Sequence, residues 1–211
     1  MGSKRGVGLA AQRALHKKSK KNAREKRNTF FKEREPCLLV IDNPSINSIW
    51  YGDITDFSAE VGETQQKHRI FPYHALARSC KTYLKQTYQS PYTLESVVFA
   101  NQREHQELGY LRRLAEDPGW SLFRKPKVGS SDIDENIQQF IDFYLETVPV
   151  MHVFMAGNDL RNHGPIADRL VSENIGVTLL CFFDEFYNST VRSLQEETRY
   201  DSYDIREFIG M

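Results

Sequence analysis

The chain of 211 residues is long enough for one domain with a hydrophobic core and one appendage. Hydrophobic residues make up 40% of it, yet no apolar run approaches the roughly 20 residues of a membrane helix, and no apolar segment of the signal-peptide type stands near the start. Three cysteines without a CxxC pair disfavour a disulfide framework and a zinc module, so we expect a protein of a reducing, intracellular compartment.

The net charge of zero conceals a basic arm. Residues 1–34 hold twelve Lys and Arg against two Glu, a net charge of +10, which leaves the rest of the chain at −10. Because the arm has too few apolar residues to form a core, we expect residues 1–35 to be disordered or helical and residues 36–211 to form the domain. Such an arm indicates a polyanion partner or a targeting signal. Its expected nucleic-acid contacts are Lys17, Lys18, Lys20, Lys21, Arg24, Lys26 and Arg27.

The alternative role of the arm is that of an address within the cell. Lysine-rich clusters are typical of nuclear import signals, so a nuclear location is favoured, with the cytoplasm and the mitochondrion left open. A mitochondrial presequence fits less well, because Lys outnumbers Arg and Ser is sparse in the arm.

Strand-like and helix-like segments alternate after the arm. Short apolar runs rich in β-branched and aromatic residues are typical of strands buried on both faces of a parallel sheet. The alternation predicts a three-layer α/β domain with a central five-stranded parallel sheet. Residues 48–69 are interpreted as a loop or lid, and His152 as a core histidine with satisfied hydrogen bonds. The expected strands are 37–41, 96–100, 120–124, 150–156 and 177–183, and the expected helices are 71–88, 104–115, 132–145 and 166–173.

Acidic or amide side chains follow three of these strands, with Asp184 and Glu185 at the end of the fifth. In an open parallel sheet, ligands bind beyond the carboxyl ends of the strands. Asp42 ends the first strand in "LLVIDNPSI", and Asn158 and Asp159 follow the fourth, after a small Ala-Gly pair that leaves room for a ligand. Carboxylates that converge there repel one another unless a cation lies between them, and Mg²⁺ prefers such oxygen ligands. Asp42 is therefore either a turn residue or the first ligand of a metal site.

A further acid stands at the start of the helix expected over residues 132–145. At about 100° per residue, Asp134 falls at the margin of the apolar stripe of this helix, whereas Asp132 faces water. The alternative role is helix capping, in which Ser131 with Asp134, or Asp132 with Glu135, forms a capping box. Because a capping acid has no need to point inward, we favour a site role for Asp134.

Short motifs carry a family resemblance. They are "VIDNPSINSIW" after the first strand, "SDIDENI" at a helix start, "FMAGND" after the fourth strand, and "GVTLLCFF" followed by "NSTVRSL" and "YDIREFI". From about Pro36 to Ile209, the chain resembles the NYN domain, a branch of the PIN-like nuclease superfamily. The resemblance implies a PIN-like sheet of strand order 3-2-1-4-5, in which Asp42 and Asp159 flank the point where the order reverses. It also implies an endoribonuclease that uses Mg²⁺, with Mn²⁺ as a substitute.

The resemblance assigns roles residue by residue. Asp42 matches the first acid of the family, Asp134 the second and Asp204 the late acid. Asn158 stands where the family has an aspartate after glycine, and Asp159 is one position on. The implied catalytic residues are Asp42, Asp134, Asp159 and Asp204, and the implied metal ligands are Asp42, Asp134, Asn158 and Asp159.

The first motif departs from the pattern of the family, because Pro44 and Ser45 interrupt it. The polar partner of Asp42 is therefore Asn43, Ser45 or Asn47. The loop that follows offers Trp50, which would either stack on an unpaired base or form part of a partly buried lid.

Basic residues near the expected acids supply further RNA contacts. Arg161 lies in the same loop as Asp159 and is a candidate for holding a phosphate. His163, in that loop, is a weaker candidate for contact with substrate. The residues that we expect to share one rim with the acids are Arg124, Lys125 and Lys127.

The function expected from these patterns is Mg²⁺-dependent cleavage of RNA phosphodiester bonds, with the arm gathering single-stranded or structured RNA through a salt-sensitive interaction. The alternative is a catalytically inactive NYN or PIN-like module that binds RNA or assembles a ribonucleoprotein, which the interrupted first motif and Asn158 favour. Ribonucleoprotein components and a second copy of the chain are the protein partners left open, and no membrane partner is expected.

Overall fold

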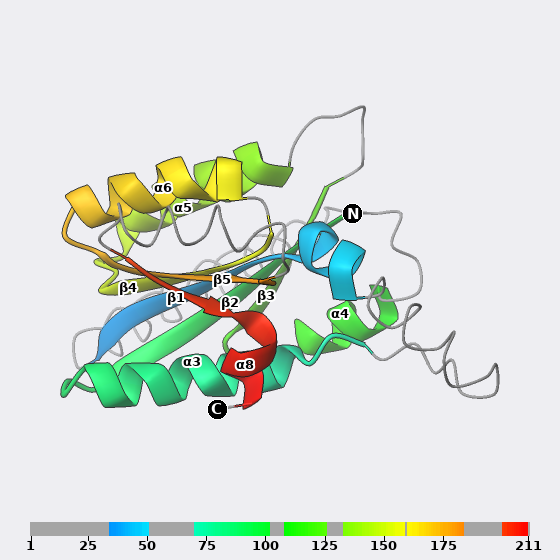
Figure 1. Ribbon diagram of the computed structural model, residues 1–211, viewed down its shortest axis with the longest axis horizontal. Helices are drawn as coiled ribbons and strands as arrows, with labels where there is room; N and C mark the ends of the chain where they lie inside the picture. The colour runs from blue at the N-terminus through cyan, green and yellow to red at the C-terminus, as the bar shows by residue number, and fades with distance from the viewer. Residues whose placement is uncertain are drawn as a thin grey trace, which may run out of the picture.

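The described part of the chain is an α/β fold in which a parallel sheet lies between two layers of helices (Figure 1). No helix in this part is both long and apolar enough to cross a bilayer. The arm before Arg34 and residues 51–69 lie outside the described part. Residues 48–50 are helical, so the loop expected over residues 48–69 is wrong at these three positions. The computed structural model describes residues 34–50, 70–101, 108–125, 133–158, 160–183 and 200–210.

Strands and helices alternate along the chain, as the apolar runs predict. The strands are β1 (Glu35–Asp42), β2 (Tyr92–Asn101), β3 (Trp120–Lys125), β4 (His152–Ala156), β5 (Gly176–Cys181) and β6 (Asp201–Asp204). The helices are α3 (Tyr73–Thr87), α4 (Leu108–Leu114), α5 (Ile133–Thr147), α6 (Leu160–Ser172) and α8 (Ile205–Gly210). A further helical segment covers residues 43–50.

The sheet has six parallel strands in the order β3-β2-β1-β4-β5-β6. The expected order of the first five strands is confirmed, but the expected count of five is wrong. β6 pairs with β5, from Thr178 opposite Asp201 to Cys181 opposite Asp204. β6 reads Asp-Ser-Tyr-Asp and contains no apolar run. An edge strand pairs on one side only and needs no continuous apolar sequence, so the pattern of doubly buried strands does not detect it.

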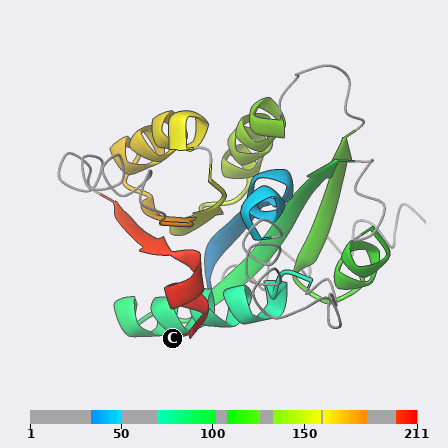
Figure 2. The ribbon, with the colours of Figure 1, turned by 45° about the vertical axis from the view of Figure 1, so that its right-hand side comes forward.

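Alternate residues of the central strand face two separate cores. Cys37, Leu39 and Ile41 pack with residues of α3 and α8 on one face of the sheet. Leu38 and Val40 pack with residues of α5 and α6 on the other face. Figure 2 shows these helical layers on opposite sides of the sheet. Because both faces are covered, the apolar run of β1 is continuous until Asp42.

Two helical segments differ from the sequence prediction, one because it was not expected and one because it begins earlier. The segment 43–50 is helical although Asn-Pro-Ser indicates a turn, because Pro44 occupies the second helical position, where a missing N–H breaks no backbone hydrogen bond. α6 begins at Leu160, not at residue 166, and contains Pro165 within it. Pro44 lies in the first turn of its segment, whereas Pro165 is the sixth residue of α6, so neither proline marks a helix boundary.

The interpretation of His152 as a satisfied core histidine is confirmed. Only 2% of its surface is exposed. Its Nδ1 lies 2.9 Å from the hydroxyl of Tyr88, and its Nε2 lies 2.9 Å from Oγ1 of Thr178. Burial lowers the pKa of His152 from 6.5 to about 4, because desolvation disfavours the charged ring.

This lowered pKa makes stability depend on pH. The unfolded chain binds a proton at position 152 below pH 6.5, whereas the folded chain does so only below about pH 4. The stability present above pH 6.5 is therefore lost as the pH falls toward 4, by about 2–3 kcal/mol. Urea unfolding from pH 7 to pH 4.5 measures the loss. His152→Gln keeps hydrogen-bonding capacity without titrating and should show a smaller loss; equal losses in the two proteins would contradict this account.

Candidate functional site

The carboxyl ends of β1 and β4 meet where the strand order reverses. β2 and β3 lie on one side of β1, and β4 to β6 lie on the other. In an open parallel sheet, this is the position of the ligand-binding crevice. Asp42 is the last residue of β1, and Gly157 and Asn158 follow Ala156, which pairs with Ile41. The first and third motifs therefore lie side by side.

Asp42 is buried, with 5% of its surface exposed, and it directly precedes the helical segment 43–50. Its Oδ1 accepts a hydrogen bond from the backbone N–H of Ser45 at 3.4 Å. This is the arrangement of a helix N-cap, but the distance exceeds the usual 2.7–3.2 Å, roughly, of an N–H···O bond. Asp42 thus caps the segment weakly while it places a carboxylate at the crevice, so the two roles suggested by the sequence are compatible.

The three neutral polar residues of the first motif have different partners. Asn43, fully buried, accepts a hydrogen bond from the hydroxyl of Tyr73 at the start of α3. Oγ of Ser45 accepts a hydrogen bond from the backbone N–H of Asn158 at 2.6 Å. Asn47 is 8% exposed. Of the three, Ser45 is the residue that joins the first motif to the third.

Asn158 ties the end of β4 to the end of β5. Its Oδ1 accepts a hydrogen bond from the backbone N–H of Phe182 at 3.1 Å. The N–H of Gly157, just before it, donates to the carbonyl of Leu180 at 3.0 Å. The oxygen that a metal role requires is therefore already directed at a backbone N–H, although a carbonyl oxygen has two lone pairs.

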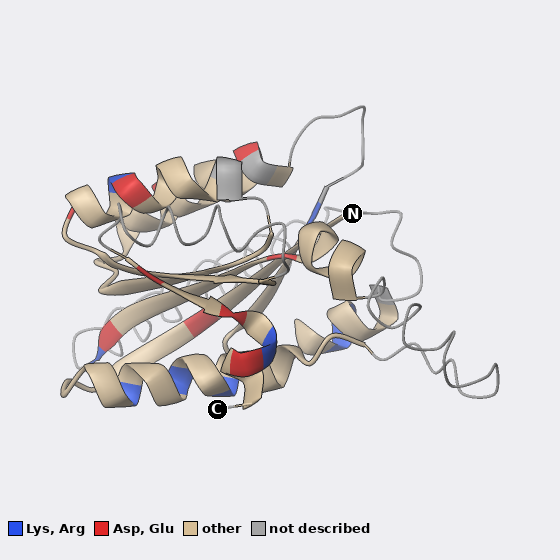
Figure 3. Ribbon diagram, viewed as in Figure 1, with Lys and Arg blue, Asp and Glu red and all other residues tan. Residues whose placement is uncertain are grey.

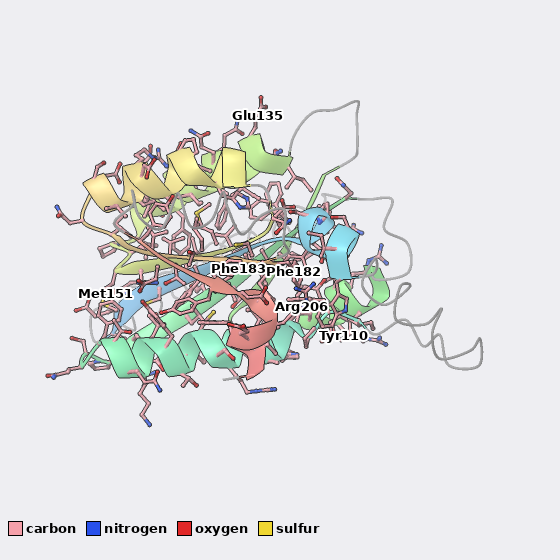
Figure 4. All side chains as sticks on the ribbon, viewed as in Figure 1. Tyr110, Glu135, Met151, Phe182, Phe183 and Arg206 are labelled. Carbon is pink, nitrogen blue, oxygen red and sulfur yellow. The ribbon has the colours of Figure 1, made fainter. Side chains whose placement is uncertain are left out.

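Asp204 holds the ends of β5 and β6. Its Oδ2 accepts a hydrogen bond from the N–H of Phe183 at 2.6 Å, and its Oδ1 accepts one from the N–H of Arg206 at 2.7 Å. Nη1 of Arg206 lies 3.5 Å from Oδ2 of Asp204, and its guanidinium lies over the ring of Phe182, 4.8 Å from the centroid. Figure 4 shows Phe182, Phe183 and Arg206 together at these strand ends.

The position of β6 limits what Asp204 can do. β6 lies three strands away from β1, which is roughly 14 Å at the usual spacing of strands. One Mg²⁺ ion holds its ligands at about 2.1 Å, so Asp204 and Asp42 are too far apart to share it. The catalytic role that the resemblance implies for Asp204 therefore excludes an ion shared with Asp42, and its hydrogen bonds to Phe183 and Arg206 give it a structural role.

His163 fills the space beside the small Ala-Gly pair. A Cβ atom placed on Gly157 would lie 2.5 Å from Cε1 of His163 and 3.1 Å from Cβ of Asp42. The expectation that this pair leaves room for a ligand is therefore wrong, because His163 and Asp42 pack against it. With 2% of its surface exposed, His163 supports the crevice from within the fold instead of lining its surface.

Replacing Gly157 by Ala should disturb this packing. The added methyl overlaps the ring of His163, so we expect a loss of about 1–3 kcal/mol in the free energy of unfolding. Gly164→Ala, in the same helix as His163, is the matched control, because a Cβ there meets no atom within 4 Å and alanine favours a helix. Urea denaturation compares the two; equal stability would show that the contact with Gly157 is loose.

Asp134 and Asp159 belong to the expected acids, but their side chains lie outside the described part of the chain. Asp134 is the second residue of α5. The N–H of Met151, which follows α5, donates to the carbonyl of Pro36 at 2.8 Å, so α5 ends at the amino ends of the strands and begins at their carboxyl ends. Asp134, at the start of α5, therefore lies at the same edge of the sheet as Asp42. Among the described side chains, no group of three or more His, Cys, Asp and Glu could hold a metal ion.

Of the expected RNA contacts, the structure describes the side chain of Arg124, which is exposed on β3. Across the sheet, Asp42 lies opposite Phe99, and Phe99 lies opposite Phe123. Arg124 is the next residue of β3, and β3 is two strands, or roughly 10 Å, away from β1. The side chains of Lys125 and Arg161 are not among those described. Outside the described residues lie Lys17, Lys18, Lys20, Lys21, Arg24, Lys26, Arg27 and Lys127.

Two residues of the site region are absent from the sequence hypotheses. Tyr73 bonds to Asn43 across 30 positions of sequence, a separation at which no local pattern predicts a partner. Arg206 pairs with Asp204 two positions away, a signal that the neighbouring letters "YDIR" do contain. Trp50, expected to stack on RNA or to form a lid, packs edge-on against Phe71 with ring centroids 5.4 Å apart.

Comparisons with known proteins bear on the fold. No protein-family model matches the chain, and no curated protein matches its sequence. The chain is similar to a crystal structure of a protein of unknown function from Vibrio parahaemolyticus, with a TM-score of 0.51 and 12% sequence identity. The alignment covers 82% of this chain and 94% of the other. At this level of identity, the similarity shows a shared fold and does not indicate a function.

Proposed function

We propose that this chain is a Mg²⁺-dependent endoribonuclease whose site lies at the carboxyl ends of β1 and β4. The observation that carries the proposal is the buried carboxylate of Asp42 at the point where the strand order reverses. The first of the motifs that resemble the NYN domain includes the same residue and assigns a metal-binding acid to it. RNA is the proposed substrate because the chain joins this site to a strongly basic arm.

Three carboxylates from three segments would hold the ion. Asp42 ends β1, Asp134 starts α5, and Asp159 lies between β4 and α6. Carboxylate oxygens are the ligands that Mg²⁺ prefers, so this donor set fits the ion chemically. When bound, the ion supplies positive charge against the phosphoryl oxygens and acidifies the attacking water.

The described residues would keep Asp42 in place for this chemistry. Ser45, in the helical segment that follows β1, accepts a hydrogen bond of 2.6 Å from the N–H of Asn158, which follows β4. Gly157 packs against the base of Asp42 and against the ring of His163. Because these contacts hold the backbone on both sides of the crevice, the carboxylate would be positioned before substrate arrives, which favours catalysis.

A circular single-stranded RNA tests the proposal, because it has no ends for an exonuclease. We expect the full chain to linearise and fragment it in Mg²⁺ or Mn²⁺ and to leave it intact in EDTA. Asp42→Asn, purified in the same way, controls for a contaminating nuclease. A circular RNA that stays intact with either metal would count against the enzyme.

The second candidate is an RNA-binding module without catalysis. Its specific support is that Oδ1 of Asn158 and both oxygens of Asp204 accept hydrogen bonds from backbone N–H groups. Two of the residues assigned to the site thus have structural partners. A chain that binds RNA, yet neither cleaves it nor melts at a higher temperature in Mg²⁺, would favour this candidate. Metal binding gained by Asn158→Asp would then indicate a decayed nuclease site.

A further inference from the structure

Two helices of equal length on opposite faces of the sheet carry opposite charge. α3 has 15 residues that include Arg78, Lys81 and Lys85 and no acid. α5 also has 15 residues and includes four acids and no base. Figure 3 shows blue segments along α3 and α4 and mostly red segments on the layer of α5 and α6. A polyanion would therefore be attracted to the α3 face and repelled by the α5 face.

The bases of α3 form one exposed stripe. Residues 78, 81 and 85 are spaced by three and four, so they lie on one side of the helix within an arc of about 60°. All three side chains are exposed. From Arg78 to Lys85 the stripe is roughly 10 Å long, which is enough to meet about two phosphates of one strand. At the preceding turn, Nε2 of His74 lies 3.4 Å from Oδ2 of Asp117, so the stripe of bases ends before it. α8, which packs beside α3, adds Arg206 and Glu207, whose charges cancel.

Aromatic contacts continue this stripe onto α4. The ring of Tyr73 stacks on that of Tyr110 with centroids 5.9 Å apart, and His74 meets Trp120 edge-on at 5.6 Å. Figure 4 shows Tyr110 on α4, at the end of the molecule where α3 begins. The last turn of α4 carries two more exposed bases, Arg112 and Arg113.

The same end of α3 reaches the candidate site. The hydroxyl of Tyr73, the first residue of α3, donates a hydrogen bond to Asn43, which is bonded in sequence to Asp42. A strand that follows α3 toward its first turn therefore arrives beside the carboxyl end of β1. The surface path from the basic stripe to the site therefore runs over the first turn of α3, beneath which Tyr73 and Asn43 are fully buried.

We propose that this path binds the phosphate backbone of single-stranded RNA and guides the strand to Asp42. We call it the α3 track, defined by Arg78, Lys81, Lys85, Arg112 and Arg113. The inference rests on the proposed function in that RNA is the polyanion. It goes beyond that function by assigning the body of the domain a binding surface of its own, separate from the arm and from the rim at Arg124.

The test measures binding of a fluorescent single-stranded oligouridine to the full chain in EDTA, so that cleavage plays no part. Each phosphate contact contributes about 0.7 to the log–log salt slope. Arg78→Gln/Lys81→Gln/Lys85→Gln should therefore lower the slope by about 2 and weaken binding by about 100-fold near 0.1 M salt. Thermal melting checks the fold. If the triple variant does not fold, the single variants replace it, each with an expected loss of about 5-fold.

Two controls separate a specific track from general charge. Adding Glu135→Gln, Glu146→Gln and Asp168→Asn to the triple variant restores the net charge without restoring the stripe, so binding should stay weak. Arg124→Gln removes one exposed arginine, as Arg78→Gln does, but from β3. We expect the Arg78 variant to lose more affinity. Recovery of binding in the charge-restored variant, or a larger loss at Arg124, would overturn the inference.

The outcomes distinguish this inference from the proposed catalysis. If the wild type binds RNA and the triple variant does not, the α3 track stands even where no cleavage is found, and only the enzyme is rejected. If the wild type cleaves RNA and the triple variant binds as tightly as the wild type, the enzyme stands and the α3 track is rejected. A wild type that binds no RNA rejects the track.

Discussion

Asp42→Asn abolishes cleavage of single-stranded RNA and leaves the chain folded. We expect activity to fall by at least about a thousandfold, because a metal ion contributes several kcal/mol to the stabilisation of a phosphoryl transition state. The fold survives because asparagine is as good an N-cap as aspartate and can accept the bond from the N–H of Ser45. The measurement is a cleavage assay beside thermal melting with and without Mg²⁺.

Melting distinguishes a metal ligand from a turn residue. If Asp42 is a metal ligand, the stabilisation by Mg²⁺, about 2.7 kcal/mol at a hundred times the Kd, should disappear in Asp42→Asn. Asp204→Asn is the matched control, since it makes the same chemical change three strands away. It should lower the free energy of unfolding by about 1–3 kcal/mol through its bonds to Phe183 and Arg206. Its response to Mg²⁺ should match that of the wild type, and full activity in Asp42→Asn would refute the assignment.

Removing residues 1–34 weakens RNA binding by several orders of magnitude. The seven arm bases expected to contact RNA would contribute about 5 to the log–log salt slope if each meets one phosphate. The domain should stay folded, because the truncation ends just before β1, where the N–H of Glu35 bonds to the carbonyl of Pro91 at 2.8 Å. The slope is measured by titrating RNA binding at increasing salt in the full and truncated chains.

The truncated chain should retain a weaker, salt-sensitive affinity. The five bases of the α3 track would leave a slope of at most about 3.5. Combining the truncation with the triple α3 variant should remove most of this remainder. A slope unchanged by the truncation would place the whole binding surface on the domain and leave the arm with its alternative role as a targeting signal.

The interior strands could be predicted because burial on both faces requires a continuous apolar run in the sequence. Leu38 to Ile41 alternate between two cores, so every position must be apolar. β6 has no apolar run, since its four residues are held by pairing with β5 at the edge of the sheet. The alternation of strands and helices predicts the layers, whereas an edge strand depends on contacts that only the folded chain brings together.

The positions of some residues of the candidate site could be predicted from the sequence, whereas their hydrogen-bond partners could not. Asp42 and Asn158 follow strands that lie side by side, so a rule about strand ends is enough to bring them together. The role of Ser45 is set by a bond to a residue 113 positions away. The bonds of Asn158 to Phe182 and of Asp204 to Phe183 depend on the register of β4, β5 and β6, which no single motif contains.

The central claim is that one metal ion lies between Asp42, Asp134 and Asp159. The most direct measurement is a crystal structure of the full chain grown with Mn²⁺, in which anomalous scattering locates the ion. We predict a peak about 2.1–2.2 Å from a carboxylate oxygen of Asp42, with the carboxylates of Asp134 and Asp159 directed toward it. A structure in saturating Mn²⁺ with no peak at Asp42, or with Asp134 turned to solvent roughly 10 Å away, would contradict the claim.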